Sequence, residues 1–510
     1  MDLHHALTLL NSTVDEVSTQ FRRVPGSAIL LRYVKNSYQN DPIRSVVELC
    51  LFLFAVRYLL APRYSTKKKT MDLTEQEIDE LVEDWTPEPL VAAPTELEAL
   101  EEERRPIIAG PTGPKVKLMN GKTVTHLASH NYYNLVQNEL LKERAVQILR
   151  NYGVGACGPP NFYGTQDVHM DTEKEIARFL GVEACIVYAQ SFSTISSVIP
   201  AFSKRGDIIV ADRGVSFAIQ KGLQVSRSTI KWFNHNDMED LERVLAQVQV
   251  EQKRKPLTRR FIVTEGLFEN TGDMPDLPKI VELKQRYKWR LILDETHSFG
   301  VLGRTGRGLT EHQNVDPSNV EMLIGSLAHA ICAGGGFCAG SAEVVEHQRI
   351  SSSAYVFSAA IPAMLSVTAM ESVKLIESNP DLITDLREKT RLFRQQLERC
   401  EQIQMTSDPA NPRTLFHIDR EIIEQKGVED EERLLADIVE ECMGSNIMIT
   451  RIKKVKDSSV TDAPKKKKDV NRDPPMLMAS VMVGHSKKDV ESAGTVIRKA
   501  VGKVLGRVKK

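Results

Sequence analysis

The sequence predicts an α/β fold in which helices cover both faces of a mostly parallel β-sheet. From about residue 140 onward, helical patterns alternate with short runs rich in β-branched residues, which is the pattern of successive strand–helix–strand units. The 510 residues are enough for one large domain or for two to three ordinary ones. Hydrophobic residues make up 41% and charged residues 26% of the chain, as in a globular protein with a sizeable core.

The elements of this body can be placed in chain order. The stretch 115–126 alternates apolar and polar residues around Asn120-Gly121, which predicts a hairpin. Helical periodicity predicts helices over 139–151, 171–180, 237–253, 276–287, 361–377 and 381–401. Strands are predicted over 184–188, 207–211, 229–233, 261–265 and 291–294. A last helix, 486–507, carries an apolar face.

Changes in composition divide the chain into five segments. They are an N-terminal arm (1–42), a membrane helix (43–61), a charged linker with short helices (62–105), a large α/β domain (106–380) and a small C-terminal α/β domain (381–510). The small domain is interrupted at 453–475 by a Lys-rich, Pro-bearing insertion that we expect to be disordered.

The segment 43–61 is the one stretch that does not fit a purely soluble protein. It is close to the roughly 20 residues that cross a bilayer, but it carries Arg44, Glu48 and Arg57. Arg44 and Glu48 lie four residues apart and can pair on one helix face. We therefore expect a single membrane-spanning or in-plane helix, with a buried core helix as the alternative.

The flanks of this segment suggest its orientation. More than 40 residues precede it and no small-residue cleavage site follows, so it is a poor secretory signal. The lysines at 67–69 come directly afterwards, and the positive-inside rule then places the following domain in the cytosol. Asn11 would be a glycosylation sequon on the far side of the membrane, although such triplets also arise by chance.

Charge and cysteine usage exclude several classes of protein. The formal net charge is −1, without the basic surplus of a general nucleic-acid-binding protein. The seven cysteines are odd in number and lack CxxC spacing, which argues against a disulfide framework and against a cysteine-based zinc site. We predict no metal site, and a reducing compartment for the bulk of the chain.

Three segments carry candidate chemistry. The first, 152–169, reads YGVGACGPPNFYGTQDVH and holds four glycines before a helix starting near Asp171; it is either a ligand loop or simply a long tight loop. The second, 290–300, reads RLILDETHSFG, in which a buried strand ends at Asp294 and His297 follows. An acid at that position can hold a pyridine nitrogen, or can be an ordinary helix cap or turn former. The third, 325–337, reads GSLAHAICAGGGF and is followed by Phe357-Ser358.

These segments, in this order, resemble the α-oxoamine synthases, the acyl-CoA-condensing branch of the pyridoxal-phosphate enzymes. The resemblance spans roughly 107–505 and extends to SKRGDIIVADRG, HNDMEDLER, TRRFIVTEG and GVLGRTGRGLTEH. Within the family it is strongest to the long-chain-base subunits 1 of serine palmitoyltransferases. It implies the pyridoxal-phosphate transferase fold of type I, with a small C-terminal α/β domain, preceded here by the N-terminal membrane helix.

The lysine that the family uses is missing. When GSLAHAICAGGGF is aligned with the same segment of the family's catalytic subunits, His329 falls where the Schiff-base lysine belongs. No lysine occurs between Lys288 and Lys374. Imidazole cannot form the imine that activates the cofactor. The resemblance also gives Ser216 for the histidine that stacks on the pyridine ring, and Met478 for the arginine that binds the substrate carboxylate. We expect the chain to be inactive alone.

Other residues of the family's cofactor pocket persist. Asp294, His297 and His169 remain, and together with Ser216 they form either a relic of that pocket or a set with a structural role.

The resemblance further implies a heterodimer with a lysine-bearing catalytic second subunit, which would bind pyridoxal 5'-phosphate covalently. Family members complete each other's active sites at the subunit interface. The residues expected there are Cys157, Tyr163, Asn131, Tyr132, Phe357 and Ser358. Cys157 has the alternative reading of a small packed residue, and Ser358 that of a turn or helix cap.

The function implied is that of a membrane-anchoring subunit in the endoplasmic reticulum, with its body in the cytosol. The complex would condense L-serine with palmitoyl-CoA to 3-ketodihydrosphingosine, and Orm-type regulators and small activating subunits would be further partners. Two alternatives stay open: an active homodimeric synthase using an unexpected lysine, and a regulatory or scaffold protein outside the complex.

Overall fold

The computed structural model describes residues 25–61, 73–85, 93–428, 430–453 and 475–507. It divides into two compact units, Met1–Ala93 and Pro94–Lys510. The lysines at 67–69, Asn11 and nearly all of the predicted insertion at 453–475 lie outside the described residues.

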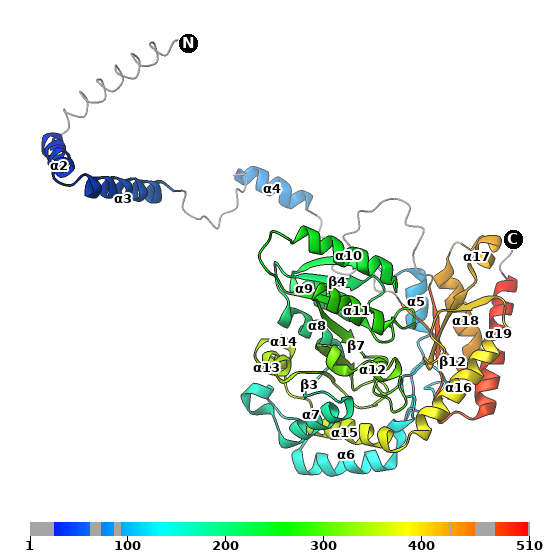
Figure 1. Cartoon of the computed structure of the whole chain (residues 1–510). Coiled ribbons are helices and arrows are strands. Elements are labelled where there is room, and N and C mark those ends of the chain that lie inside the picture. The colour runs from blue at the N-terminus through cyan, green and yellow to red at the C-terminus, as the bar shows by residue number, and fades with distance from the viewer. Residues whose placement is uncertain (1–24, 62–72, 86–92, 429, 454–474, 508–510) are drawn as a thin grey trace. The chain divides into compact units, whose positions relative to one another are not determined.

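The described part of the first unit consists of three helices: α2 (Ser27–Asn40), α3 (Pro42–Leu60) and α4 (Glu75–Asp84) (Figure 1). The α3 helix confirms the helix predicted at 43–61. Its start is fixed by Asp41, whose side chain accepts a hydrogen bond from the Arg44 backbone N–H at 3.1 Å, and by Pro42 in the first turn. The predicted pair between Arg44 and Glu48 is present at 2.9 Å.

No side chain of α3 is buried within the chain. Among the described residues, no helix is both long enough and apolar enough to cross a membrane. The predicted transmembrane span is therefore not supported. Helix α3 carries Arg44, Glu48 and Arg57, which flank its apolar run of residues 49–56.

The second unit is built on a seven-stranded sheet with the order β3-β9-β8-β7-β6-β4-β5 (Figure 1). Its strands are β3 (Ala184–Tyr188), β4 (Ile208–Asp212), β5 (Thr229–Phe233), β6 (Arg260–Glu265), β7 (Arg290–Asp294), β8 (Met322–Ser326) and β9 (Gly336–Gly340). Strands β5, β4, β6, β7 and β8 are parallel to one another, and β9 runs antiparallel to both of its neighbours. The mostly parallel sheet predicted from the sequence is confirmed.

Helices lie on both faces of this sheet. Alternate residues of β4 belong to different hydrophobic clusters: Ile208 and Val210 to one, Ile209 and Ala211 to the other, as the two-residue period of a strand requires. The first cluster includes side chains of α7 (Asp167–Leu180), α10 (Met238–Glu251), α11 (Leu277–Tyr287) and α15 (Ala363–Ser378). The second includes side chains of α8 (Ser191–Phe202), α9 (Phe217–Ser226), α13 (Ala342–Ser351) and α14 (Ser353–Val356).

The C-terminal part carries a four-stranded antiparallel sheet in the order β10-β11-β14-β13. Its strands are β10 (Ile403–Met405), β11 (Arg413–Ile418), β14 (Leu477–Ser480) and β13 (Thr450–Arg451). The helices here are α16 (Asp381–Leu397), α17 (Arg420–Lys426), α18 (Glu431–Gly444) and α19 (Lys487–Arg507). The last of these agrees with the helix predicted at 486–507.

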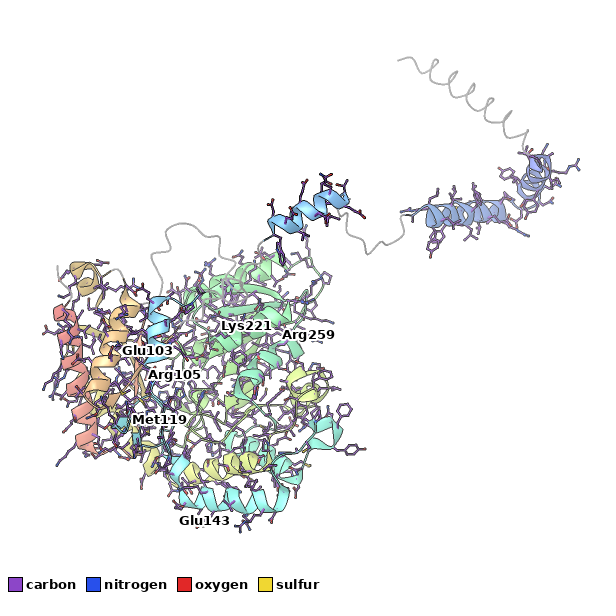
Figure 2. The ribbon with its side chains drawn as sticks, turned by 180° about the vertical axis from the view of Figure 1, so that it is seen from behind. Glu103, Arg105, Met119, Glu143, Lys221 and Arg259 are labelled. Carbon is purple, nitrogen blue, oxygen red and sulfur yellow. The ribbon has the colours of Figure 1, made fainter. Side chains whose placement is uncertain are left out.

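The predicted hairpin forms as β1 (Lys115–Lys117) and β2 (Thr123–His126), and β2 also pairs in parallel with β12 (Ile447–Met448). Helix α5 (Glu96–Glu103) also contacts a C-terminal strand, because Glu101 forms an ion pair with Arg451 of β13 at 2.5 Å. Glu103 and Arg105 mark the end of α5 in the view from behind (Figure 2). Helix α5 and the β1–β2 hairpin are thus joined to the C-terminal strands.

Candidate functional site

Carboxylates collect at the carboxyl ends of the central parallel strands. Asp212 ends β4, Glu265 ends β6 and Asp294 ends β7, and all three are buried. Glu265 and Asp294 are register partners on adjacent strands. Burial, together with their mutual proximity, raises the pKa of Glu265, and burial raises the pKa of Asp294. Neither carboxyl group has a basic partner among the described residues, so each keeps its proton to a higher pH than an exposed carboxyl group would.

Ser216 has a local structural role. It is the N-cap of α9, its hydroxyl accepts a hydrogen bond from Ile219 N–H at 3.4 Å, and its own N–H donates to Glu265. A small hydroxyl residue suits this position because it caps the helix while allowing the backbone to reach the carboxylate.

Three histidine rings converge around His329, the residue that the resemblance aligns with the family's Schiff-base lysine. His297 and His329 are stacked, with ring centroids 4.8 Å apart and an interplanar angle of 13°. His130 meets both edge-on, at 5.5 Å from His297 and 4.6 Å from His329. His329 is held in place by a 3.1 Å contact between Nδ1 and the Thr296 carbonyl. Burial lowers the pKa of each ring, so all three imidazoles are neutral at physiological pH.

These residues do not fit a pyridoxal phosphate held as an imine. The neutral histidine cluster contains no amine, and no lysine occurs in the sequence between Lys288 and Lys374. Asp294 itself does not exclude the cofactor, because its pKa of about 6 leaves it mostly ionised at neutral pH, with Oδ1 accepting a hydrogen bond from Thr296 N–H at 2.9 Å. The misfit therefore lies in the missing amine.

Arg413 is a buried residue near the histidine cluster that the sequence analysis did not predict. It is the first residue of β11, is only 2% exposed, and is paired in register with Ser480 of β14. Directly opposed residues of an antiparallel pair point to the same face, as do residues two apart on one strand. Arg413 therefore shares a face with Met478, the position where the resemblance expected an arginine. No signal in the β11 sequence revealed this, because it depends on the pairing of two strands about 65 residues apart.

His169 lies in a different setting. Its Nδ1 accepts a hydrogen bond from Gln166 N–H at 3.0 Å and its Nε2 donates to the Ile361 carbonyl at 2.7 Å. Its Nδ1 thus stabilises the N-terminus of α7, and its Nε2 holds the segment that precedes α15. This accounts for α7 beginning at Asp167 rather than near Asp171.

The glycine-rich loop and the Phe357-Ser358 segment lie together. The Ala360 N–H donates to the Gly158 carbonyl at 2.9 Å, and the Asn161 side chain donates to the Arg349 carbonyl at 2.5 Å. Gly164 is required here, since a Cβ at this position would lie 2.0 Å from the Gly158 carbonyl oxygen. The loop presents Tyr163 to solvent in a left-handed conformation with φ of 67°.

The predicted interface residues fall into two groups. Cys157 and Tyr163 are exposed, Phe357 is 81% exposed and Ser358 is half-buried. Exposed aromatic side chains on adjacent segments are typical of a surface that another protein covers. Asn131 and Tyr132 are instead buried beside the histidine cluster, where Asn131 Oδ1 accepts from Cys332 Sγ at 3.0 Å.

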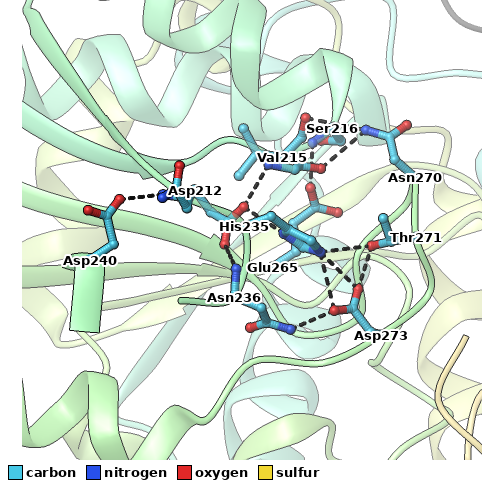
Figure 3. Close-up of polar contacts among 12 residues, drawn as sticks. Asp212, Val215, Ser216, His235, Asn236, Asp240, Glu265, Asn270, Thr271 and Asp273 are labelled. Carbon is cyan, nitrogen blue, oxygen red and sulfur yellow. Dashed lines mark hydrogen bonds and ion pairs between the residues drawn. The ribbon is translucent and has the colours of Figure 1, made fainter. Parts of the chain in front are cut away.

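A further polar network, which the sequence did not reveal, joins the loops after β4, β5 and β6 (Figure 3). His235 bridges two carboxylates, with Nδ1 2.8 Å from Asp212 and Nε2 3.2 Å from Asp273. Asn236 donates to the same two carboxylates. Burial alone would lower the pKa of His235, but the bonds to Asp212 and Asp273 outweigh it and raise the pKa to about 10.

The charge on His235 decides what this network can do. Thr271 Oγ1 lies 3.2 Å from His235 Nε2, which superficially resembles a nucleophile beside a base. A histidine that is already protonated at neutral pH cannot accept the hydroxyl proton. The network is therefore an anchor for three loops rather than a hydrolytic site.

Comparison with known proteins gives consistent results. The family model "Aminotransferase class I and II" matches residues 122–455. "Long chain base biosynthesis protein 1" of Arabidopsis thaliana is 38% identical over 464 residues, covering 91% of this chain and 93% of that protein. "Serine palmitoyltransferase 1" of Dictyostelium discoideum is 40% identical, covering 88% of this chain and 92% of that protein. The protein of the same name from Saccharomyces cerevisiae is 42% identical, with coverages of 72% and 69%.

Solved structures share the fold. A Sphingomonas wittichii serine palmitoyltransferase superposes with a TM-score of 0.69 at 22% identity, covering 81% of this chain and 97% of that chain. A serine palmitoyltransferase structure with a pyridoxal-phosphate internal aldimine gives a TM-score of 0.69 at 19% identity, with coverages of 84% and 98%. The predicted α/β architecture of pyridoxal-phosphate-dependent transferases is thereby confirmed.

Proposed function

The chain belongs to the aminotransferase class I and II family and, within it, to the first subunits of serine palmitoyltransferase, and from this premise we propose that it is the non-catalytic, membrane-anchoring subunit of that enzyme. The complex condenses L-serine with palmitoyl-CoA, releasing CO2 and CoA, and forms 3-ketodihydrosphingosine. This is the entry step of sphingolipid synthesis.

The histidine cluster carries the proposal. His329 occupies the expected lysine position, is stacked on His297 and is contacted by His130. A cluster of neutral imidazoles has no amine that could attack the cofactor aldehyde. Pyridoxal 5'-phosphate is therefore assigned to a lysine-bearing second subunit. An active homodimer would need an amine at this place, which the described pocket does not supply.

The exposed aromatic surface supports an obligate partner. Tyr163 and Phe357 project from two segments that are hydrogen-bonded to each other through Gly158 and Ala360. Exposing large aromatic rings on a rigid surface costs free energy in water unless a partner covers them. We assign this surface, with Cys157 and Ser358, to the interface with the catalytic subunit.

Helix α3 is assigned to membrane binding. Its apolar side chains are exposed along the whole helix, Phe52 at 65% and Phe54 at 67% among them. Its charged residues favour contact with the headgroup region, where Arg57 can extend toward phosphates. We place the protein at the endoplasmic reticulum membrane with its body in the cytosol. Orm-type regulators and small activating subunits are the partners proposed for this N-terminal region.

Co-expression tests the function. The chain is purified alone, with a lysine-bearing second subunit, and with that subunit after its Schiff-base lysine is replaced; the second subunit is also purified without this chain. We expect cofactor absorbance and serine-plus-palmitoyl-CoA turnover only from the intact pair. Activity of the chain alone would overturn the non-catalytic assignment. Full activity of the second subunit without this chain would overturn the obligate role.

A further inference from the structure

Arg413 is a buried cation without an acidic partner. Its guanidinium Nη2 donates to the Glu269 carbonyl at 2.5 Å, whereas Nε and Nη1 are shielded from solvent and have no partner among the described residues. No ion pair of Arg413 occurs among those residues either. Arginine keeps its charge in proteins, and buried arginines are almost always paired with an anion. The side chain is therefore set up to bind a negative group.

Other unsatisfied polar atoms surround the same place. They are the Tyr132 hydroxyl, His130 Nε2, His297 Nδ1 and Ser480 Oγ, all buried and without a partner among the described residues. Ser480 faces Arg413 directly across the strand pair. Residues 127–132, which carry His130 and Tyr132, lie along the chain at Ser480, because Ser480 N–H donates to the Leu127 carbonyl at 2.6 Å and Val483 N–H to the Tyr132 carbonyl at 2.7 Å. Burial and, to a lesser extent, the charge of Arg413 lower the pKa of His130, His297 and His329.

This arrangement is unusual for a merely structural core. Native proteins leave few buried polar atoms unpaired, and each one is costly. Here they come from four separate segments: the loop after β2, the loop after β7, β11 and β14. Hydroxyl and neutral imidazole groups can each donate a hydrogen bond, and the guanidinium fork matches two oxygens of one carboxylate or phosphate.

We propose that the pocket formed by Arg413, Tyr132, His130, His297 and Ser480 binds a small oxyanion, either a carboxylate or a phosphate. The anion accepts hydrogen bonds from Arg413 Nε and Nη1 and from the Tyr132 hydroxyl. This inference goes beyond the proposed function and holds whether or not the chain serves that enzyme.

Thermal unfolding of the purified full chain, alone and together with the proposed second subunit, tests this. Melting is recorded in sodium chloride, sodium phosphate and sodium acetate at equal ionic strength, since a ligand that binds the folded state raises the melting temperature. We expect phosphate or acetate to raise the melting transition of this chain above its value in chloride. Phosphate alone would identify a phosphate site, and acetate alone a carboxylate site. No stabilisation by either anion would overturn the proposal.

Variants assign the effect to the pocket. Arg413→Met should weaken the apparent affinity for the effective anion by about tenfold or more, because charge-assisted hydrogen bonds are lost. Arg394→Met is the matched control: Arg394 is also a buried arginine of the C-terminal part, but it donates to Ser407 and Asp408.

If Arg413→Met does not fold, Tyr132→Phe removes only one donor and should still weaken binding. Equal anion stabilisation of Tyr132→Phe, Arg413→Met and the unaltered chain would refute the assignment. The readout does not depend on cofactor or turnover, so its failure is distinct from failure of the proposed function.

Discussion

Replacing His235 with glutamine should remove a pH-dependent share of the stability. The imidazole is bonded to Asp212 and Asp273, and its pKa rises from 6.5 to about 10. Each pKa unit corresponds to about 1.4 kcal/mol, so the full shift amounts to about 5 kcal/mol. Since 27% of the side chain is exposed to solvent, screening reduces this, and we expect a loss of about 2–3 kcal/mol.

The stabilisation by His235 should decrease as the pH rises. Because the folded pKa lies above the unfolded value, the contribution of His235 is complete below about pH 6.5. It decreases as the pH rises, and it is lost above about pH 10. The free energy of unfolding of the unaltered chain and of His235→Gln should therefore differ most at pH 6 and converge toward pH 10.

Urea unfolding at several pH values between 6 and 10 measures this difference. His347→Gln is the control, because His347 makes one hydrogen bond, to the Ala201 carbonyl at 2.8 Å, and no ion pair among the described residues. Its replacement removes a half-buried imidazole without removing an ion pair. A His235→Gln difference that stays constant from pH 6 to pH 10 would refute the doubly paired imidazolium.

Three further results are expected. Tyr163→Ala combined with Phe357→Ala should reduce the amount of second subunit that co-purifies by at least severalfold, whereas alanine at the equally exposed Leu257 should not; equal recovery would exclude the aromatic surface as the interface. Gly164→Ala should destabilise the loop by about 1–3 kcal/mol, because its Cβ would overlap the Gly158 carbonyl oxygen. Urea unfolding measures this loss, and a fully tolerated alanine would contradict the packing. Replacing the exposed Phe54 by glutamate should weaken sedimentation of the chain with phospholipid vesicles, and unchanged binding would argue against α3 as the membrane element.

Much of the fold could be predicted because local sequence pattern determines it. The alternation of helical windows with β-branched runs gave the strands from Ala184 to Asp294 within a residue or two. Short-range pairs were equally accessible, as the Arg44–Glu48 contact confirms. The membrane span was different: the sequence suggested a membrane-spanning or in-plane helix despite its three charged residues, and among the described residues no helix is long and apolar enough to cross a membrane.

What the sequence did not reveal depends on long-range pairing. The antiparallel insertion of β9 between β3 and β8, and the parallel contact of β2 with β12, join segments whose local patterns do not specify a partner. The same limit applied to the site. The position of His329 could be inferred from a motif. Its stacking on His297, and the pairing that sets Arg413 opposite Ser480, can be seen only in the folded chain.

The most direct test of the central claim locates the cofactor. The purified complex is treated with borohydride, which converts a pyridoxal imine into a stable secondary amine, and the modified lysine is identified by peptide mass spectrometry. We predict that the label lies only on the second subunit and that this chain carries none, including its peptides around His329. A stoichiometric pyridoxyl-lysine on this chain would contradict the assignment of the histidine cluster as a site that cannot hold the cofactor.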